Sequence, residues 1–511
     1  MKSIVILGGG FGGLCTGALL ARLGMQVTVL EKNHSIGGGL QSFTRKGIDF
    51  ETGMHILAGL SDGQAVNLIF NYLGIMKRLR IKRSDEDCMD QITYLSDGVS
   101  YRIPQGREAF CHALCSYFPH ECRGIEAYVE ACYQLANEVD IFYLRPTESP
   151  FALHSERFMQ PADEFIASFV TDYRLRDILA YMNPMYGGVA GHSPAYIHAI
   201  INVLYIGGQY HFVGRSQHLA EELAQVIVEH GGRVLTDKSV ISIDTINREV
   251  TGVKTSDGVL YQADYYISAI HPQLLPPMMG DRGFPKAFTE RLMSAPNTYS
   301  AFILYLTFKD QVFPYINHTC YLQDDYGIVW EHGRYDAANW PRGLMYITPP
   351  EEQQGKWAKR MTINCILPWN EVKKWEDSRV GHRGEAYEKW KQKQKELILR
   401  KMELVYPGFR DKILDCYSAS PLTIRDYYGS PQGTLYGLQK DCKDPARTML
   451  MPVTKIRNLL LTGQCINLHG ICGVPLTAIN TAEAILGINT VVNKINQYHQ
   501  HYKQIECYGN N

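Results

Sequence analysis

The sequence has almost no excess of either charge, and this absence limits its partners. Lys and Arg together number 51 and Asp and Glu number 52, so the formal net charge at pH 7 is −1. Chains that bind nucleic acids generally carry a basic excess that neutralises phosphates. We therefore expect no nucleic-acid partner.

Metal-ligand spacing is also missing. The 13 cysteines form no CxxC pair and no set spaced with histidines like a zinc site. Cys111 and Cys115 fall on one helix face, but no neighbouring residue completes a site. We expect no bound metal, and free thiols in a reducing compartment.

Long apolar runs are absent as well, because no segment offers 18 to 20 predominantly apolar residues of helical quality. Residues 3–21 are uncharged, but their glycine-rich stretch GGGFGG makes a poor signal-peptide core. We expect a cytoplasmic protein, and leave peripheral contact with a membrane open.

The chain does have length and tyrosine. Its 511 residues suffice for two or more domains, and 32 of them are tyrosines. Tyrosine suits the wall of a large pocket because it joins an apolar ring to a polar tip. An enlarged core would use tyrosine in the same way.

A glycine-rich loop follows the first expected strand. Ile4–Leu7 reads as a buried strand, Gly8, Gly10 and Gly13 form GxGxxG, and Leu14–Leu23 reads as a helix. Such glycines permit a tight turn, close approach of a diphosphate and close packing of helix on strand. The diphosphate then binds at the N-terminus of the helix.

An acidic residue and a second glycine patch extend this pattern. The next strand, Gln26–Leu30, ends at Glu31, where a carboxylate can bind the diol of a ribose. Gly37–Gly39 and Ser42 follow, and then Glu51. A longer, folded-over dinucleotide needs two close approaches of the backbone, and no second GxGxxG occurs in a strand–helix setting. The sequence therefore favours FAD over NAD.

A similar strand–turn–helix lies near the other end, in LLLTGQCINLHGICGVPLTAINTAEAIL. Gly463, Gly470 and Gly473 punctuate its turn. Taken alone, the segment also fits a buried strand–turn–helix with glycines for packing. Together with the first loop, it suggests one flavin held by both ends of the chain.

These motifs closely resemble those of the phytoene desaturase, carotenoid isomerase and retinol saturase group. The stretches EKNHSIGG with FETGMH, FPHECRGIEAY, GGQYHFVGRSQHLAEEL, EHGGRVLTDKSVISI and ASPLTIRDYYGSPQGTLYGL carry the resemblance in order along the chain. It implies an α/β flavoprotein with a Rossmann-like, two-dinucleotide-binding FAD domain and a substrate domain of mixed β-sheet and helices. It also implies that the helix from about Val474 to Leu486 points its N-terminus at the flavin ring, where its dipole favours negative charge.

The resemblance and the motifs together give the residues expected at FAD. In the family the backbone at the position of Val240 pairs with adenine. The expected set is Gly8, Gly10, Phe11, Gly12, Gly13, Glu31, Lys32, Gly38, Gly39, Leu40, Ser42, His55, Val240, Gly463, Gln464, Gly473, Val474 and Pro475.

The same resemblance divides the chain into two discontinuous domains and a tail. We expect residues 1–60, 207–280 and 448–495 to form the FAD-binding domain. The substrate domain then comprises 61–206 and 281–447. Residues 496–511 are expected to be a C-terminal tail.

One long stretch without charged residues indicates where the substrate binds. Residues 178–214 contain no Asp, Glu, Lys or Arg, which indicates burial. The stretch fits the lining of an apolar cavity best, with plain core or membrane insertion as alternatives. Ser300–Phe308 is a strong β run that suits a floor beneath such a cavity.

Four side chains are candidates for proton delivery: His55, Tyr186, His192 and His469. We favour His55 because the resemblance places its segment beside the flavin, although a lone histidine is more often structural. Cys465 and His469 depart from the retinol saturase pattern, which leaves the proton donor and the direction of the reaction open. A covalent bond from Cys465 or Cys472 to the flavin is a minor alternative.

The function expected from these features is FAD-dependent redox chemistry at carbon–carbon double bonds of a hydrophobic polyene or isoprenoid lipid, with saturation as in retinol saturase. A desaturase or a cis–trans isomerase uses the same flavin geometry and stays an alternative. A prenyl-lipid binder without catalysis and an amine oxidase are further alternatives. An external electron donor or acceptor is implied.

Two basic segments are candidates for contact with anionic lipid. Residues 76–83, MKRLRIKR, follow an apolar stretch, and residues 388–405 have an amphipathic, basic helical pattern. For the first segment a lipid-facing and a solvated surface are equally good readings. For the second a solvated face fits better.

Overall fold

The computed structural model describes residues 2–53, 55–148, 153–280, 283–466 and 468–509, with side chains as far as His501. Met54 of the expected flavin-side segment and residues 510–511 of the expected tail lie outside the described residues.

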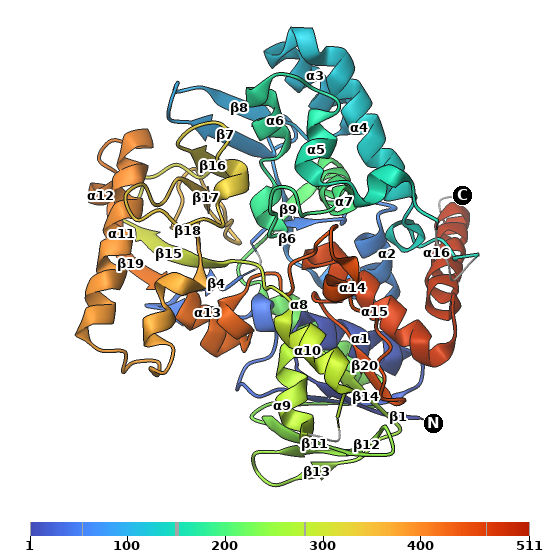
Figure 1. Ribbon diagram of the computed structural model, residues 1–511. Coiled ribbons are helices and arrows are strands. Elements are labelled where there is room, and N and C mark those ends of the chain that lie inside the picture. Colours follow the sequence, from blue (N-terminus) through green and yellow to red (C-terminus); the bar gives the residue numbers. More distant parts are fainter. Residues whose placement is uncertain (1, 54, 149–152, 281–282, 467, 510–511) are drawn as a thin grey trace.

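A five-stranded parallel sheet joins the two ends of the chain (Figure 1). Its strands come from three separate segments and are short, apolar and largely buried. In spatial order they are β10 (Arg233–Leu235), β2 (Gln26–Leu30), β1 (Ser3–Leu7), β14 (Tyr265–Ser268) and β20 (Leu459–Leu461).

Three helices cover this sheet, and the first packs on both of the others: α1 (Phe11–Arg22), α8 (Gln217–Glu229) and α15 (Gly470–Leu486). α1 begins at Phe11, earlier than the expected Leu14, because Gly10 is extended and already acts as its N-cap. α15 likewise begins at Gly470, with His469 as its extended N-cap, so Gly470 and Gly473 lie in its first turn while Gly463 precedes the helix.

An antiparallel three-stranded sheet of β11 (Val240–Ile246), β12 (Glu249–Thr255) and β13 (Leu260–Tyr261) is inserted before β14. An Asp-Gly turn joins β12 to β13, and Gly258 there has φ +85°, which favours glycine.

The second large element is a seven-stranded mixed sheet in which only the β16–β7 pair is parallel. All nine residues of its strand β15 are buried. In order, its strands are β19 (Ile413–Ala419), β15 (Ser300–Phe308), β18 (Arg360–Leu367), β17 (Gly343–Ile347), β16 (Thr319–Gln323), β7 (Asp90–Tyr94) and β8 (Ser100–Ile103).

A helical layer surrounds the uncharged stretch. Within it α7 (Ala195–Ile206) is buried along all twelve residues and packs on α4 and α5. The other helices of this layer are α2 (Ala65–Tyr72), α3 (Arg107–Tyr117), α4 (Cys122–Asn137), α5 (Ala162–Ala167) and α6 (Tyr173–Leu179).

The remaining elements cover the edges of these layers. β3 (Ser42–Arg45) pairs with β4 (Ile48–Glu51), and β9 (Gln209–Phe212) lies between β5 (Leu57–Ala58) and β6 (Ile81–Arg83). The other helices are α9 (Leu275–Met279), α10 (Lys286–Ser294), α11 (Glu385–Val405), α12 (Phe409–Lys412), α13 (Pro421–Tyr428), α14 (Pro445–Thr448) and α16 (Thr490–Gly509).

The expected C-terminal tail begins inside α16. Asn496 in that helix donates a hydrogen bond from Nδ2 to the carbonyl of Leu144 at 2.9 Å, and a ring nitrogen of His499 lies 2.9 Å from the carbonyl of Leu68. The described start of the tail therefore packs on the helical layer. The domain division itself stays a proposal.

Both basic segments make contacts within the protein. Arg78 pairs with Glu222 at 2.9 Å, and Arg83 pairs with Glu86 at 2.9 Å. In α11, Ile398 and Met402 are fully buried against the seven-stranded sheet. Along the described chain no single helix is long and apolar enough to cross a membrane; α15 and α16 reach that limit only as a pair, bent by 115°.

Candidate active site

Three glycine segments meet at the ends of the central strands. A Cβ on Gly12 would lie 2.7 Å from the Cα of Gly463, and a Cβ on Gly38 would lie 3.2 Å from the Cα of Gly10. The amide of Gly37 also donates to the carbonyl of Gly9 at 2.8 Å. The N-terminal loop therefore touches both the second glycine patch and the C-terminal turn, backbone against backbone.

A cavity of about 420 Å³ opens above these glycines. Most residues expected at FAD line it: Gly8, Gly10, Phe11, Gly12, Glu31, Lys32, Gly38, Gly39, Leu40, His55, Val240, Gly463, Gln464 and Val474.

The other four expected residues lie behind this lining. Gly13 packs on the carbonyl of Gly8, and Gly473 packs on Leu468, each too closely for a side chain. Ser42 has its Oγ 3.3 Å from Oγ of Ser216. Pro475 is buried within α15.

The N-terminus of α1 is open toward the cavity. Its N-cap residue, Gly10, has no side chain that could cap the helix, and the first intrahelical donor is the amide of Leu14. The amides of the first turn are therefore available to an anion, and the helix dipole favours negative charge there. A Cβ on Gly10 would meet nothing closer than Gly38 Cα at 3.9 Å, so the space above Gly10 is free for a ligand.

Glu31 is held at the cavity wall by two backbone amides. Gly9 N and Asn33 N each donate to its carboxylate at 2.8 Å, and the residue is only 5% exposed. Burial raises the pKa of Glu31, while the amides of Asn33 and Gly9 and the charge of Lys32 oppose that rise. The remaining lone pairs of the carboxylate can accept hydrogen bonds from a ribose diol.

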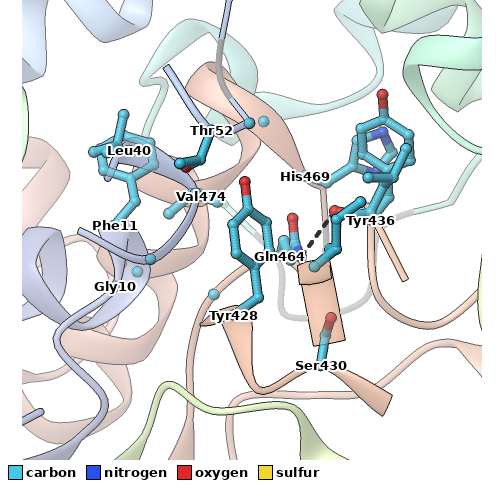
Figure 2. A pocket seen from close by; sticks show the side chains of 18 of the residues that line it. Gly10, Phe11, Leu40, Thr52, Tyr428, Ser430, Tyr436, Gln464, His469 and Val474 are labelled. Carbon is cyan, nitrogen blue, oxygen red and sulfur yellow. Dashed lines mark hydrogen bonds between the residues drawn. The ribbon is translucent and has the colours of Figure 1, made fainter. Parts of the chain in front are cut away.

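The C-terminal end of α13 covers this end of the cavity, a feature that the sequence reasoning missed. Asn33 Nδ2 donates to the carbonyl of Tyr427 at 3.0 Å, and a Cβ on Gly53 would lie 1.6 Å from the hydroxyl of Tyr428. In Figure 2, Tyr428 stands between Thr52 and Gln464. A tyrosine at the end of a helix carries no local signal of such a role, although its stretch was part of the family resemblance.

His55 lies in the cavity wall with an acidic neighbour. Its Nδ1 is 3.3 Å from Oε2 of Glu51, and both side chains are buried. His55 Nε2 and Glu51 Oε1 are buried and have no hydrogen-bond partner within the described part of the chain. Of these two residues, His55 lines the cavity, so its Nε2 is available to a ligand there.

His469 also lines the cavity, next to Tyr436, with ring centroids 5.0 Å apart (Figure 2). Burial and the charge of Lys440 lower the pKa of His469 to about 3. His469 is therefore neutral at physiological pH, which makes it a weak proton donor.

Lys440 places a positive charge beneath the C-terminal turn. Its Nζ donates to the carbonyls of Cys465 at 2.8 Å and Ile466 at 3.2 Å, and burial lowers its pKa to about 8. At neutral pH this buried cation, like the N-terminus of α15, favours negative charge on a group bound above the turn.

The structure does not bring Tyr186 and His192 to the cavity. Neither is among the described residues that line it. The hydroxyl of Tyr186 is 3.1 Å from His198 Nδ1 in the core, and His192 pairs with Asp441 at 3.0 Å with its side chain 41% exposed.

The far part of the cavity is largely apolar. The uncharged stretch contributes Met185 together with Ile201 and Leu204 of α7, and strand β15 contributes Ala301 and Ile303. The uncharged stretch is thus both core and cavity wall, because one face of α7 packs on neighbouring helices while another lines the cavity.

A parallel sheet with a glycine loop, a buried acid at the end of its second strand and a C-terminal glycine turn against that loop defines a dinucleotide-binding flavoprotein. The chain belongs to the flavin containing amine oxidoreductase family, whose sequence profile matches residues 11–328. The fold class and the FAD cofactor predicted from the sequence are confirmed, and the protein is an FAD-dependent enzyme of the oxidoreductase and isomerase type.

Individual relatives extend over nearly the whole chain. All-trans-retinol 13,14-reductase of Macaca fascicularis is 27% identical and covers 95% of this chain and 86% of its own length. Prolycopene isomerase 2 of an Oncidium hybrid cultivar is 26% identical and covers 94% of this chain and 83% of its own length. A solved oxidoreductase from Methanosarcina mazei shares the fold, with a TM-score of 0.63 and 17% identity. The match covers 94% of this chain and 100% of that one.

Proposed function

We propose that this enzyme adds hydrogen across a carbon–carbon double bond of a hydrophobic polyene or isoprenoid lipid. The observation that carries the proposal is the apolar wall of α7 and β15, which continues from the glycine cradle within one cavity. A water-soluble substrate would gain little from such a wall, whereas an oily chain is stabilised by burying its apolar surface. The reductase named among the relatives supports the same substrate class.

The protein's part in this reaction is to hold the cofactor, orient the lipid and deliver a proton. The residues that would hold FAD are the glycine loops, Glu31 and the first turn of α1. Once reduced by an external electron donor, the bound flavin would supply the hydride and return to its oxidised form. The second carbon of the double bond needs a proton, which we assign to Nε2 of His55, because Nδ1 is engaged by Glu51.

A redox-neutral cis–trans isomerisation is the second candidate, favoured by the prolycopene isomerases among the relatives.

We also propose the two-domain division given above, with a lipid phase as the source of the substrate. Contact of the protein with that phase through residues 76–83 is part of this proposal.

The test is anaerobic incubation of the chemically reduced holoprotein with a panel of polyenes, followed by mass spectrometry. Saturation predicts a gain of two hydrogens together with reoxidation of the flavin. A changed isomer of unchanged mass would support isomerisation. Bleaching of the oxidised flavin by a more saturated lipid would support desaturation, and bleaching by primary amines alone would overturn the lipid substrate.

A further inference from the structure

Three polar side chains line the part of the cavity that is formed by the seven-stranded sheet. Gln323 ends β16, Asn364 lies in β18, and His332 follows directly after a short 3₁₀ turn at Val329–Glu331. All three line the cavity. In Figure 1 their strands lie well away from β1, β14 and β20, which carry the FAD cradle.

Two atoms of this group lack partners. Gln323 Oε1 and Asn364 Nδ2 are buried, and neither has a hydrogen-bond partner among the residues that the structure describes. A buried polar atom without a partner destabilises a protein by about 1–3 kcal/mol, so such atoms are usually matched. One of these atoms is an acceptor and the other a donor.

Gly343 makes the space for this group. It pairs with Gln323 across β16 and β17, and a Cβ on it would lie 2.2 Å from Gln323 Oε1 and 2.3 Å from His332 Cε1. The φ of Gly343 is not among the positive values of the chain, so its backbone does not require glycine. Glycine is required because the side chains of Gln323 and His332 occupy the space that a Cβ would fill.

The group is electrically neutral. Burial, together with the charges of Arg342 and Lys401, lowers the pKa of His332 to about 4, so its imidazole is uncharged at physiological pH. Arg342 pairs with Glu331 at 2.6 Å, and Lys401 pairs with Asp324. Neither cation is therefore left to balance a carboxylate in this part of the cavity.

We propose that Gln323, His332 and Asn364 bind a terminal hydroxyl group of the substrate, while its carbon chain lies along α7 and β15. This inference rests on the proposed function, since it assumes a lipid in the cavity. A hydroxyl can donate to Gln323 Oε1 and accept from Asn364 Nδ2 at once. A hydrocarbon satisfies neither atom, an aldehyde satisfies only Asn364, and a carboxylate brings an uncompensated charge.

The test compares four probes with one carbon skeleton: all-trans-retinol, the aldehyde, the carboxylate and the parent hydrocarbon. Dissociation constants are measured with oxidised holoprotein by perturbation of the flavin spectrum. The alcohol is expected to bind at least about tenfold more tightly than the hydrocarbon. Gln323→Leu and Asn364→Leu should each remove most of that advantage, measured as the ratio of the alcohol's affinity to the hydrocarbon's.

A matched control is Gln394→Leu. Gln394 is also a buried glutamine whose Oε1 has no partner in the described structure, but it lies in α11 and is not among the described cavity residues. This variant should leave all four affinities unchanged. Thermal unfolding checks the fold of each variant, and Gln323→Leu should melt no lower than the wild type because it removes an unmatched buried oxygen.

The possible outcomes separate the two proposals. If all four probes bind equally, or if the variants keep the advantage of the alcohol, the hydroxyl site is wrong while the lipid substrate stands. If the carboxylate binds most tightly, the neutral character of the site is wrong. If none of the four binds, the lipid substrate of the proposed function itself fails.

Discussion

At the scale of single residues, two glycines two positions apart in the first loop have different reasons to be glycine. Gly10 has φ −75°, an ordinary backbone conformation, and only open cavity beside its Cα. Gly12 faces the backbone of Gly463 instead. The first glycine therefore serves the ligand, and the second serves contact between the two ends of the chain.

This difference predicts separable effects of substitution. Gly10→Val should fold with nearly the wild-type melting temperature as apoprotein but weaken FAD binding by at least about 100-fold, because its side chain fills the diphosphate site. Gly12→Val should instead destabilise the apoprotein by about 1–3 kcal/mol through its clash with the backbone of Gly463. Flavin absorbance per chain and thermal unfolding measure the two effects. Stoichiometric FAD in Gly10→Val would contradict the assignment.

His55 and His192 offer a second comparison between residues. His55→Gln should lower the rate of hydrogen transfer per bound flavin by about 100-fold or more, because it removes the proposed proton donor. His192→Gln, outside the cavity and partly exposed, should change this rate little. Single-turnover mixing of reduced holoprotein with a polyene gives both rates. Equal rates in His55→Gln and wild type would exclude the donor.

At the scale of elements, sequence reasoning located strands and helices where the signal is local. The spacing of Gly8 to Gly13 and the position of Glu31 depend only on a strand, a turn and a helix, which share one short segment. It did not identify Tyr428, Gln323 or Asn364, because these residues meet the cavity only after distant strands have paired. A histidine in a short loop, such as His192, looks the same in sequence whether it faces a cavity or solvent.

Asp90 joins three elements and predicts a pH effect on stability. It lies fully buried in β7, accepts a hydrogen bond from the hydroxyl of Tyr181 at 2.6 Å, and faces Gln209 of β9 at 3.4 Å. Burial raises its pKa from 3.8 to about 7, although its partners Tyr181, Gln209 and Thr319 oppose the rise. Between about pH 4 and 7, the folded state therefore keeps a proton that the unfolded state has lost.

The stabilising contribution of Asp90 is thus fully present below about pH 4 and is lost as the pH rises to about 7. Asp90→Asn removes this dependence. Its stability relative to wild type should therefore rise between pH 4.5 and pH 8 by on the order of 2–4 kcal/mol. Thermal unfolding at the two pH values measures the change. A difference between variant and wild type that is the same at both would show that Asp90 does not titrate in this window.

At the scale of the whole molecule, the proposed FAD site is an interface between the two ends of the chain. The N-terminal loop touches Gly463, α1 packs on α15, and β20 extends the sheet begun by β1. No single segment of the described chain can form the site alone. Binding energy from FAD must therefore stabilise segments that are more than 400 residues apart.

Hydrogen exchange tests this coupling directly. Saturation with FAD at 100 times its dissociation constant stabilises the folded state by about 2.7 kcal/mol, equivalent to roughly 100-fold slower exchange through coupled opening. Removal of FAD should therefore speed exchange at residues 8–13, 37–40 and 463–474 together. Amides of β15 and β18, which pair within the other sheet, should change much less. Faster exchange confined to residues 8–13 would mean that the C-terminal turn does not hold the cofactor, since a shared ligand must protect both of the surfaces that bind it.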